Sequence, residues 1–245
     1  MKNLLIYLNP NKYFNEEHNI LVKIQIDNSL ELGWKPEDII LVTNFEYEYN
    51  GIKSMVVDGI NFCYFRPLST KTVTVAYLLE KGMINKGELY WVHDFDAYQL
   101  EPITEEEIGL DEEEMQAGFM DYGWSTKWCL GSYFFKDSAK NIFKSIKDTI
   151  YQYKIEDERA LVALTRKNIN NINDWYKKLN ITYGFGMRNV ASNYEKAIKP
   201  LKVIHFHPWH RGVKTLDIFM YGKNEMKIPL MTDRLIKIFN KYGIR

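Results

Sequence analysis

The first hundred residues alternate short apolar runs with longer segments that carry helix signals, and this alternation restricts the fold more than any other feature. Short apolar runs flanked by turn residues are typical of strands. The helical segments end at Gly33 and Gly82, as helix C-termini favour. The predicted strands are NLLIYL (3–8), DIILVTN (38–44), KSMVVDG (53–59), NFCYFRP (61–67) and ELYWV (88–92), and the predicted helices are 15–32 and 69 or 70 to about 81. Strands that alternate with helices predict a parallel sheet whose ligands bind at the carboxyl ends of the strands.

The remainder of the chain shows more varied patterns. The acidic segment 102–123 lacks sustained periodicity, which predicts a solvated loop or a short exposed helix. Apolar residues then predict strands at 126–135 and 201–207, and helical spacing predicts helices at 138–154, 155–168, 171–179 and about 232–242. No repeat or linker divides the 245 residues, so we expect a single α/β domain with a mixed, mostly parallel sheet flanked by helices.

Composition excludes several classes of function. Lys plus Arg and Asp plus Glu both number 32, so no global basic field would attract nucleic acid. No run approaches the roughly 18 apolar residues that span a bilayer, and we expect no transmembrane segment. Cys63 and Cys129 lie within apolar runs, which predicts buried thiols and a cytoplasmic location.

The strand predicted at 88–92 leads into Asp94 and Asp96. Side chains at i and i+2 of an extended segment share a side, so both carboxylates can face one point. Together they would repel each other, whereas a shared divalent cation removes that cost and suits oxygen ligands. The alternative is a solvated turn at the end of a strand.

Three histidines follow the apolar strand in VIHFHPWHRG (203–212). His205 and His207 share one side of an extended segment, and neutral imidazole binds divalent metals. A polar turn whose histidines bond to the backbone is the alternative interpretation.

Two further segments could carry chemistry. IEDERAL places Glu156, Asp157 and Glu158 before an apolar helical run, where carboxylates either take part in a reaction or cap the helix. YGFGMRN (183–189) combines two glycines, which allow close backbone approach, with Arg188, which could contact a phosphate or a sugar.

HDFD and VIHFHPWH together resemble the Asp-X-Asp motif and the late histidine segment of nucleotide-sugar glycosyltransferases with the GT-A fold. The retaining members of that type include glycogenin and bacterial galactosyltransferases. The resemblance implies one Rossmann-like GT-A domain over 1–245, with a nucleotide-binding half at 1–100 and an acceptor-binding half at 101–245. It also implies transfer of a sugar from a nucleotide diphosphate donor, a UDP-sugar, to a hydroxyl of a glycan or other acceptor, with retained configuration.

The same resemblance assigns a metal site to Asp94 and Asp96 with His205 as third ligand and His207 as the second choice. A histidine beside two carboxylates favours Mn²⁺ over Mg²⁺. His207 stands where the family has a lysine before Pro-Trp, so Arg211 or Lys214 would supply charge to the diphosphate. Arg188 would lie in a loop over the donor.

Uracil and ribose would lie near the ends of the first two strands in that family, and the corresponding residues are Leu8, Asn9, Thr43 and Asn44, with Asp58 and Lys71 nearby. Ordinary turn or cap chemistry is the alternative explanation for each of these residues. An acidic residue at the position of Asp157, or secondly Glu158, commonly binds the acceptor hydroxyl or acts as the base.

Two other functions use similar residues. A metal-dependent nucleotidyltransferase or phosphohydrolase would also use paired aspartates, although no glycine-rich phosphate loop follows the first strand. A binding or structural protein could hold zinc with the histidine cluster, and its metal would then be needed for folding.

Overall fold

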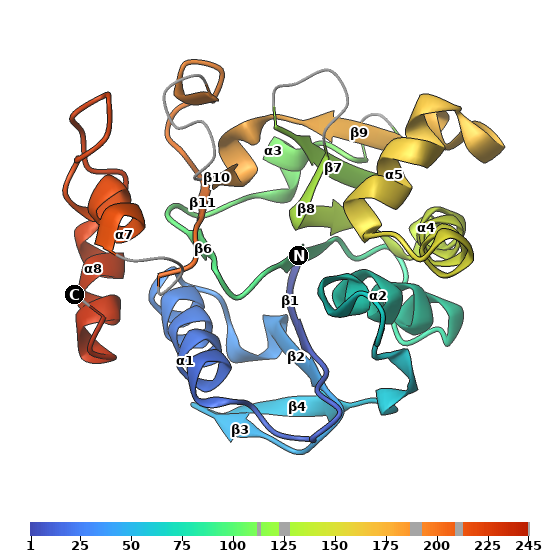
Figure 1. Cartoon of the computed structure of the whole chain (residues 1–245), viewed down its shortest axis with the longest axis horizontal. Coiled ribbons are helices and arrows are strands. Elements are labelled where there is room, and N and C mark those ends of the chain that lie inside the picture. Colours follow the sequence, from blue (N-terminus) through green and yellow to red (C-terminus); the bar gives the residue numbers. More distant parts are fainter. Residues whose placement is uncertain (112–113, 123–127, 187–192, 209–212, 245) are drawn as a thin grey trace.

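Figure 1 shows a computed structural model of the chain, which describes residues 1–111, 114–122, 128–186, 193–208 and 213–244. It is a mixed α/β structure with an eight-stranded sheet, a smaller three-stranded sheet and helices on both faces. Within the described residues, no helix combines the length and the apolar character that crossing a membrane requires.

The first part of the chain follows the predicted alternation. Its strands are β1 (Lys2–Tyr7), β2 (Ile39–Thr43), β3 (Glu48–Tyr49), β4 (Ile52–Val56) and β5 (Tyr90–His93), and its helices are α1 (Glu16–Glu31) and α2 (Thr70–Glu80). Asn15 caps α1, because its side-chain oxygen accepts the His18 N–H at 2.8 Å. The predicted strand at 61–67 is wrong: residues 62–66 form no strand and lie between two short 3-10 turns, Gly59–Asn61 and Pro67–Ser69.

Three later strands, β7 (Ala117–Asp121), β8 (Trp128–Phe135) and β9 (Tyr176–Leu179), extend the large sheet. Its strand order is β3-β4-β2-β1-β5-β8-β7-β9. Strands β4, β2, β1 and β5 are parallel, whereas β8 (Trp128–Phe135) is antiparallel to both of its neighbours. The small sheet contains β10 (Phe185–Gly186), β11 (Val203–His205) and β6 (Ala97–Gln99), of which the last two are antiparallel. The mixed, mostly parallel sheet flanked by helices is confirmed.

Two segments differ from the predictions. The acidic segment 102–123 contains the short helix α3 (Glu105–Ile108) but also the buried strand β7 (Ala117–Asp121). This strand was not predicted, because its short apolar run follows many acidic residues. The predicted helix at 171–179 is a 3-10 segment (Ile169–Asp174) followed by β9 (Tyr176–Leu179), which pairs with β7. Pairing with a neighbouring strand overrides the local helical spacing here.

The remaining helices are α4 (Lys140–Tyr153), α5 (Asp157–Arg166), α7 (Val213–Met220) and α8 (Asp233–Lys241), and of these only α7 was not predicted. The two larger apolar clusters lie on opposite faces of the sheet. Along β1, Leu4 and Ile6 face α2, α4 and α5, whereas Leu5 faces α1 and α8. A parallel sheet covered on both faces leaves the strand ends as the open place for a ligand.

Candidate functional site

Asp94 and Asp96 lie where β5 ends and the chain turns into β6. Asp94 directly follows the strand, and the Ala97 N–H donates to the Asp94 carbonyl at 3.0 Å, so residues 94–97 form a tight turn. The carboxylates therefore share one side because the chain turns, and the extended geometry expected from the sequence is wrong. Strand β6 then pairs with β11 so that Ala97 lies opposite His205. This pairing brings the histidine segment to the aspartates.

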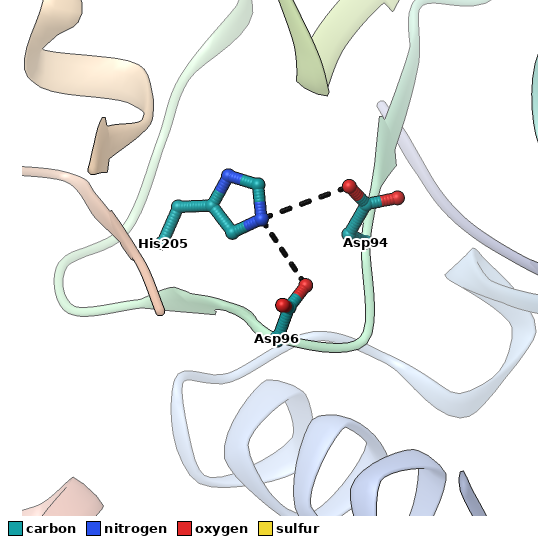
Figure 2. Close-up of side chains that lie close together, drawn as sticks. All are labelled: Asp94, Asp96 and His205. Carbon is teal, nitrogen blue, oxygen red and sulfur yellow. Dashed lines mark hydrogen bonds and ion pairs between the residues drawn. The ribbon is translucent and has the colours of Figure 1, made fainter. Parts of the chain in front are cut away.

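The three predicted metal ligands lie together (Figure 2). His205 Nε2 is 3.1 Å from Asp96 Oδ1 and 3.7 Å from Asp94 Oδ2. One ligand atom from each residue lies within 4.8 Å of the others. Two carboxylate oxygens and an imidazole nitrogen around one point are a donor set that suits a divalent transition metal such as Mn²⁺.

Gly131 on β8 makes room for this arrangement. A Cβ at position 131 would lie 2.2 Å from His205 Cε1 and 3.1 Å from Asp94 Oδ2. The ring's other nitrogen, Nδ1, is 3.9 Å from the Cys129 thiol, so Nε2 is the nitrogen that faces the carboxylates. The residues present therefore fit a cation bound by Asp94, Asp96 and His205.

Charge within the cluster is strongly coupled. Burial alone would raise the pKa of Asp96, but the adjacent His205 outweighs it and lowers the pKa to about 2. Burial likewise disfavours the charged ring of His205, yet Asp96 raises its pKa well above the ordinary value. A proton on His205 thus takes the place that a cation would take, and metal binding would have to displace it.

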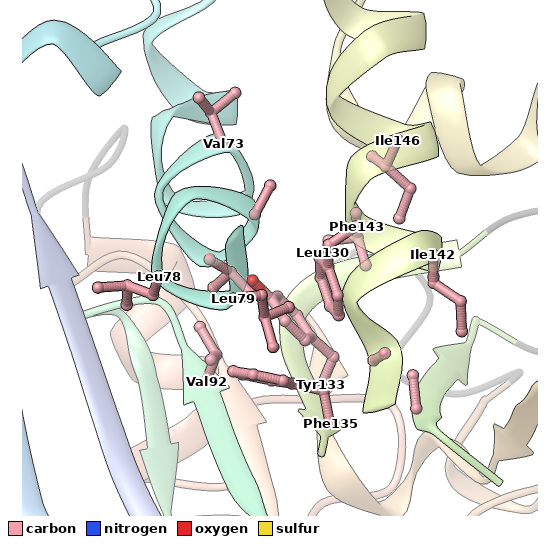
Figure 3. Packing of buried hydrophobic residues seen from close by; sticks show 14 of the residues in the cluster. Val73, Leu78, Leu79, Val92, Leu130, Tyr133, Phe135, Ile142, Phe143 and Ile146 are labelled. Carbon is pink, nitrogen blue, oxygen red and sulfur yellow. The ribbon is translucent and has the colours of Figure 1, made fainter. Parts of the chain in front are cut away.

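Lys71 reaches the same place from α2. Its ammonium contacts Asp94 Oδ1, donates to the Leu130 carbonyl at 2.5 Å and lies 5.6 Å from the centre of the Tyr133 ring. Burial opposes the charge, but Asp94 and Asp157 together raise the Lys71 pKa. Helix α2 is held by the apolar packing between α2, β5, β8 and α4 that Figure 3 shows. The lysine is therefore presented from a rigid element.

Asp157 and Glu158 begin α5 beside this cluster of charges. Asp157 is 6% exposed, and its carboxylate accepts bonds from the Thr72 hydroxyl at 2.5 Å and the Glu158 N–H at 3.0 Å. Glu158 accepts the Leu130 N–H at 3.0 Å. Burial raises the pKa of both carboxyls. These contacts include helix-end bonding, and the predicted roles of the two residues in acceptor binding or proton transfer stay predictions.

The predicted nucleotide residues lie at the ends of β1, β2 and β4. Asn44 Oδ1 accepts the Asn9 N–H and its Nδ2 donates to the Asn9 carbonyl, both at 2.9 Å. The Thr43 hydroxyl bonds to the Phe45 carbonyl, and Leu8 is buried in the apolar core. An open hollow of about 530 Å³ lies beside these groups, lined by Pro10, Lys12, Asn44, Val56, Val57, Asp58, Gly59 and Tyr64.

Several predicted residues are not part of either group. His207 Nε2 is 2.6 Å from Glu17 on α1, and the converging group of ligand atoms consists of Asp94, Asp96 and His205. Arg188 and Arg211 lie outside the described residues, and Lys214 lies on α7 with its side chain outside them.

Two residues of this site were missed by the sequence reasoning. Gly131 and Cys129 both lie on β8 and contact the space around His205. A glycine inside an otherwise bulky apolar strand often marks a bulge or a close approach, and WCLGSYFF carried that signal. The pairing of β8 with β7 is indeed irregular here.

No family model and no curated protein sequence matches this chain. Solved glycosyltransferase structures match its fold. The galactosyltransferase LgtC in complex with donor and acceptor sugar analogues has 12% identity and a TM-score of 0.62, covering 98% of this chain and 96% of its own. A glycosyltransferase involved in glycosylation of the major capsid of PBCV-1 (12%, TM-score 0.51, 84% and 93%) and mouse xyloside xylosyltransferase 1 without ligand (11%, TM-score 0.51, 84% and 96%) are also similar. The GT-A fold predicted from the sequence is confirmed.

Proposed function

We propose that this chain, which has the GT-A fold, is a metal-dependent glycosyltransferase. It would move a sugar from a UDP-sugar to a hydroxyl of a glycan or other acceptor, with retained anomeric configuration. The observation that carries the proposal is the convergence of Asp94, Asp96 and His205 at the carboxyl end of β5. Ligands of such sheets bind at this edge.

Asp94, Asp96 and His205 would hold the cation, and the histidine favours Mn²⁺ over Mg²⁺. When bound, the cation would stabilise the negative charge that grows on the departing diphosphate. The carboxylates would bind it in their ionised form, and His205 would bind it through neutral Nε2.

Lys71 would supply a second positive charge to the diphosphate. Its ammonium already lies against Asp94, so a phosphate oxygen that reaches the cluster would lie within reach of it. Arg188, Arg211 and Lys214 remain predicted donor contacts.

The hollow at the ends of β2 and β4 would hold the nucleoside. Asp58 lines it and could accept hydrogen bonds from ribose hydroxyls. The side-chain amide of Asn44, in contrast, is hydrogen-bonded to the backbone of Asn9. Tyr64 is 74% exposed and lines the same hollow, so its ring offers a flat apolar surface. Recognition here would combine shape with backbone groups.

Asp157 would act on the acceptor side, with Glu158 as the second choice. Its raised pKa and its bond from Thr72 suit a group that positions a hydroxyl. Retention fits a reaction in which a departing phosphate oxygen takes the acceptor proton. Asp157→Asn should then weaken acceptor use more than donor binding, and an inverted product in NMR analysis would instead make Asp157 or Glu158 the general base.

A structural zinc site is the competing reading, and the local geometry disfavours it. Structural zinc sites are closed and take four protein ligands. Among the described residues only three converge, and the Asp94 side chain is 38% exposed.

A cytoplasmic location is also part of the proposed function, because both cysteines are buried thiols.

A panel of nucleotide sugars with and without Mn²⁺ tests the proposal. Thermal protection and slow donor hydrolysis that both require the metal would support it. Equal protection without Mn²⁺, or unfolding on chelation of the protein as purified, would overturn it in favour of a metal-independent or structural role.

A further inference from the structure

We propose that Gln25, a buried side chain on α1, is a positioning residue that holds the turn carrying Asp96. The inference rests on the proposed metal site, because it assigns to α1 the task of fixing that site's geometry. Gln25 touches neither Asp94 nor His205 through any contact that the structure shows, and it would act only through the backbone of the turn.

Gln25 is 1% exposed and lies on the buried face of α1, one turn after Leu21 and one turn before the polar Asn28. Its Nε2 donates to the Phe95 carbonyl at 2.8 Å and to the Ala97 carbonyl at 3.0 Å. The two protons of one amide group thus bind the residues on either side of Asp96. A buried amide is costly unless it is hydrogen-bonded, and these are the bonds that this one makes.

The turn carries four consecutive carbonyls, and each has a donor. Asp94 O accepts the Ala97 N–H at 3.0 Å, and Asp96 O accepts the Phe206 N–H at 2.9 Å. Gln25 supplies the donors for the remaining two. In the described part of the chain Gln25 donates to both of these carbonyls, so α1 supports the conformation of Asp96.

Helix α1 is itself a rigid support. Asn28, one turn further along, donates to the Gln99 carbonyl at 2.9 Å, and Ser29 receives a bond from Asn3 on β1 at 2.9 Å. Metal sites need their ligands held closely, and changes in the groups that orient a ligand typically cost about 10- to 100-fold in metal affinity. Gln25 occupies that orienting position for Asp96.

Gln25→Met tests the inference, because methionine keeps the length and apolar body of the side chain while removing both donors. We expect Mn²⁺ affinity, measured by electron paramagnetic resonance in the presence of UDP, to fall by about 10-fold or more. We also expect faster hydrogen exchange at the Ala97 and Phe206 amides, measured without metal. If Gln25→Met does not fold, Gln25→Ala removes the same donors without adding bulk.

Asn28→Leu is the matched control. It removes a buried amide donor from the same helix to the same segment, but its acceptor lies beyond the ligand turn. It should lower thermal stability at least as much, because the Arg234 guanidinium also loses its Asn28 acceptor, while leaving Mn²⁺ affinity and the two amides near the parent values.

Unchanged Mn²⁺ affinity or unchanged exchange in a folded Gln25 variant would overturn the inference, as would equal losses in Asn28→Leu. A parent protein that binds no Mn²⁺ would overturn the proposed function instead. The exchange measurement would then decide by itself whether Gln25 holds the turn, so the two failures are distinguishable.

Discussion

The two polar groups at the edge of the sheet are built in opposite ways. At the end of β5, Asp94, Asp96 and His205 turn toward one point. At the ends of β1 and β2, Asn44 turns to the backbone of Asn9 and closes two hydrogen bonds there. The first group offers side chains to a ligand, whereas the second uses its side chain to shape a hollow.

Polar residues at strand ends are therefore not all equally good evidence for a binding site. A carboxylate cluster beside a histidine leaves oxygen and nitrogen lone pairs for a cation. An asparagine that bonds both the N–H and the carbonyl of one residue has few hydrogen-bonding positions left for a ligand. Binding at the metal end (Asp94, Asp96 and His205) should therefore depend on individual side chains. Binding at the nucleotide end (Asn9 and Asn44) should depend on the shape that the backbone takes.

The largest expected effect comes from Asp96→Ala. Loss of a ligand from a three-residue site should weaken Mn²⁺-dependent UDP binding by about 100-fold or more, above the range typical of residues that only orient ligands. The fold should persist, since the carboxylate is partly exposed. Calorimetric titration with UDP and Mn²⁺ measures the effect. Binding as tight as in the parent would remove the distinction between the two ends.

Gly131→Ala should come next. The added Cβ would lie 2.2 Å from the His205 ring, so the ring must move away from the carboxylates. We expect a fall of about 10- to 100-fold in Mn²⁺ affinity, measured by electron paramagnetic resonance.

Gly118→Ala provides the control for that substitution. Its Cβ would lie 2.8 Å from Leu179 Cδ1, a similar steric conflict on the neighbouring strand but with a flexible side chain. It should lower stability without changing metal affinity. If both variants lose metal affinity equally, the loss reflects general destabilisation.

The buried His93, which ends β5 directly before Asp94, provides a further test. Its ring stacks on Trp91, and its two nitrogens lie 2.9 Å from Asp94 O and 3.0 Å from Asn3 Oδ1. Burial lowers the His93 pKa from 6.5 to about 3. Between these values the unfolded chain binds a proton that the folded chain excludes, so stability rises with pH across this window and is lost as pH falls.

The expected contribution of His93 is a loss of up to about 1.4 kcal/mol of unfolding free energy per pH unit below 6.5. Urea unfolding of the parent and of His93→Gln, both with chelator, isolates this contribution as their difference. If the unfolding free energies of the two proteins change with pH in parallel, His93 has the same pKa in the folded and the unfolded chain, and the prediction is wrong.

Asn44→Ala should have the smallest effect on binding and a modest one on stability. Removing its two bonds to Asn9 should cost about 1–3 kcal/mol of unfolding free energy. UDP affinity of the folded variant should change less than in Asp96→Ala. A large loss of affinity with unchanged stability would mean that Asn44 contacts the nucleotide directly, and that the two ends work alike.

The local elements were mostly predictable, because apolar periodicity and capping residues act over a few neighbours. Helix α1 and the strands β1, β2 and β5 follow from that information. Strand β9 does not, since Tyr176–Leu179 becomes a strand only by pairing with β7. Sheet pairing is non-local, and local propensity cannot report it.

The types of ligand are evident from the amino-acid sequence. Two aspartates one residue apart after an apolar strand, and a histidine that ends a later one, define donors that a divalent cation can use. Which of them meet depends on tertiary packing: the β6–β11 pairing brings His205 to the aspartates, His207 contacts Glu17, and Gly131 leaves room for the His205 ring. Residues more than a hundred positions apart meet only through packing, which depends on the whole chain rather than on any segment of it.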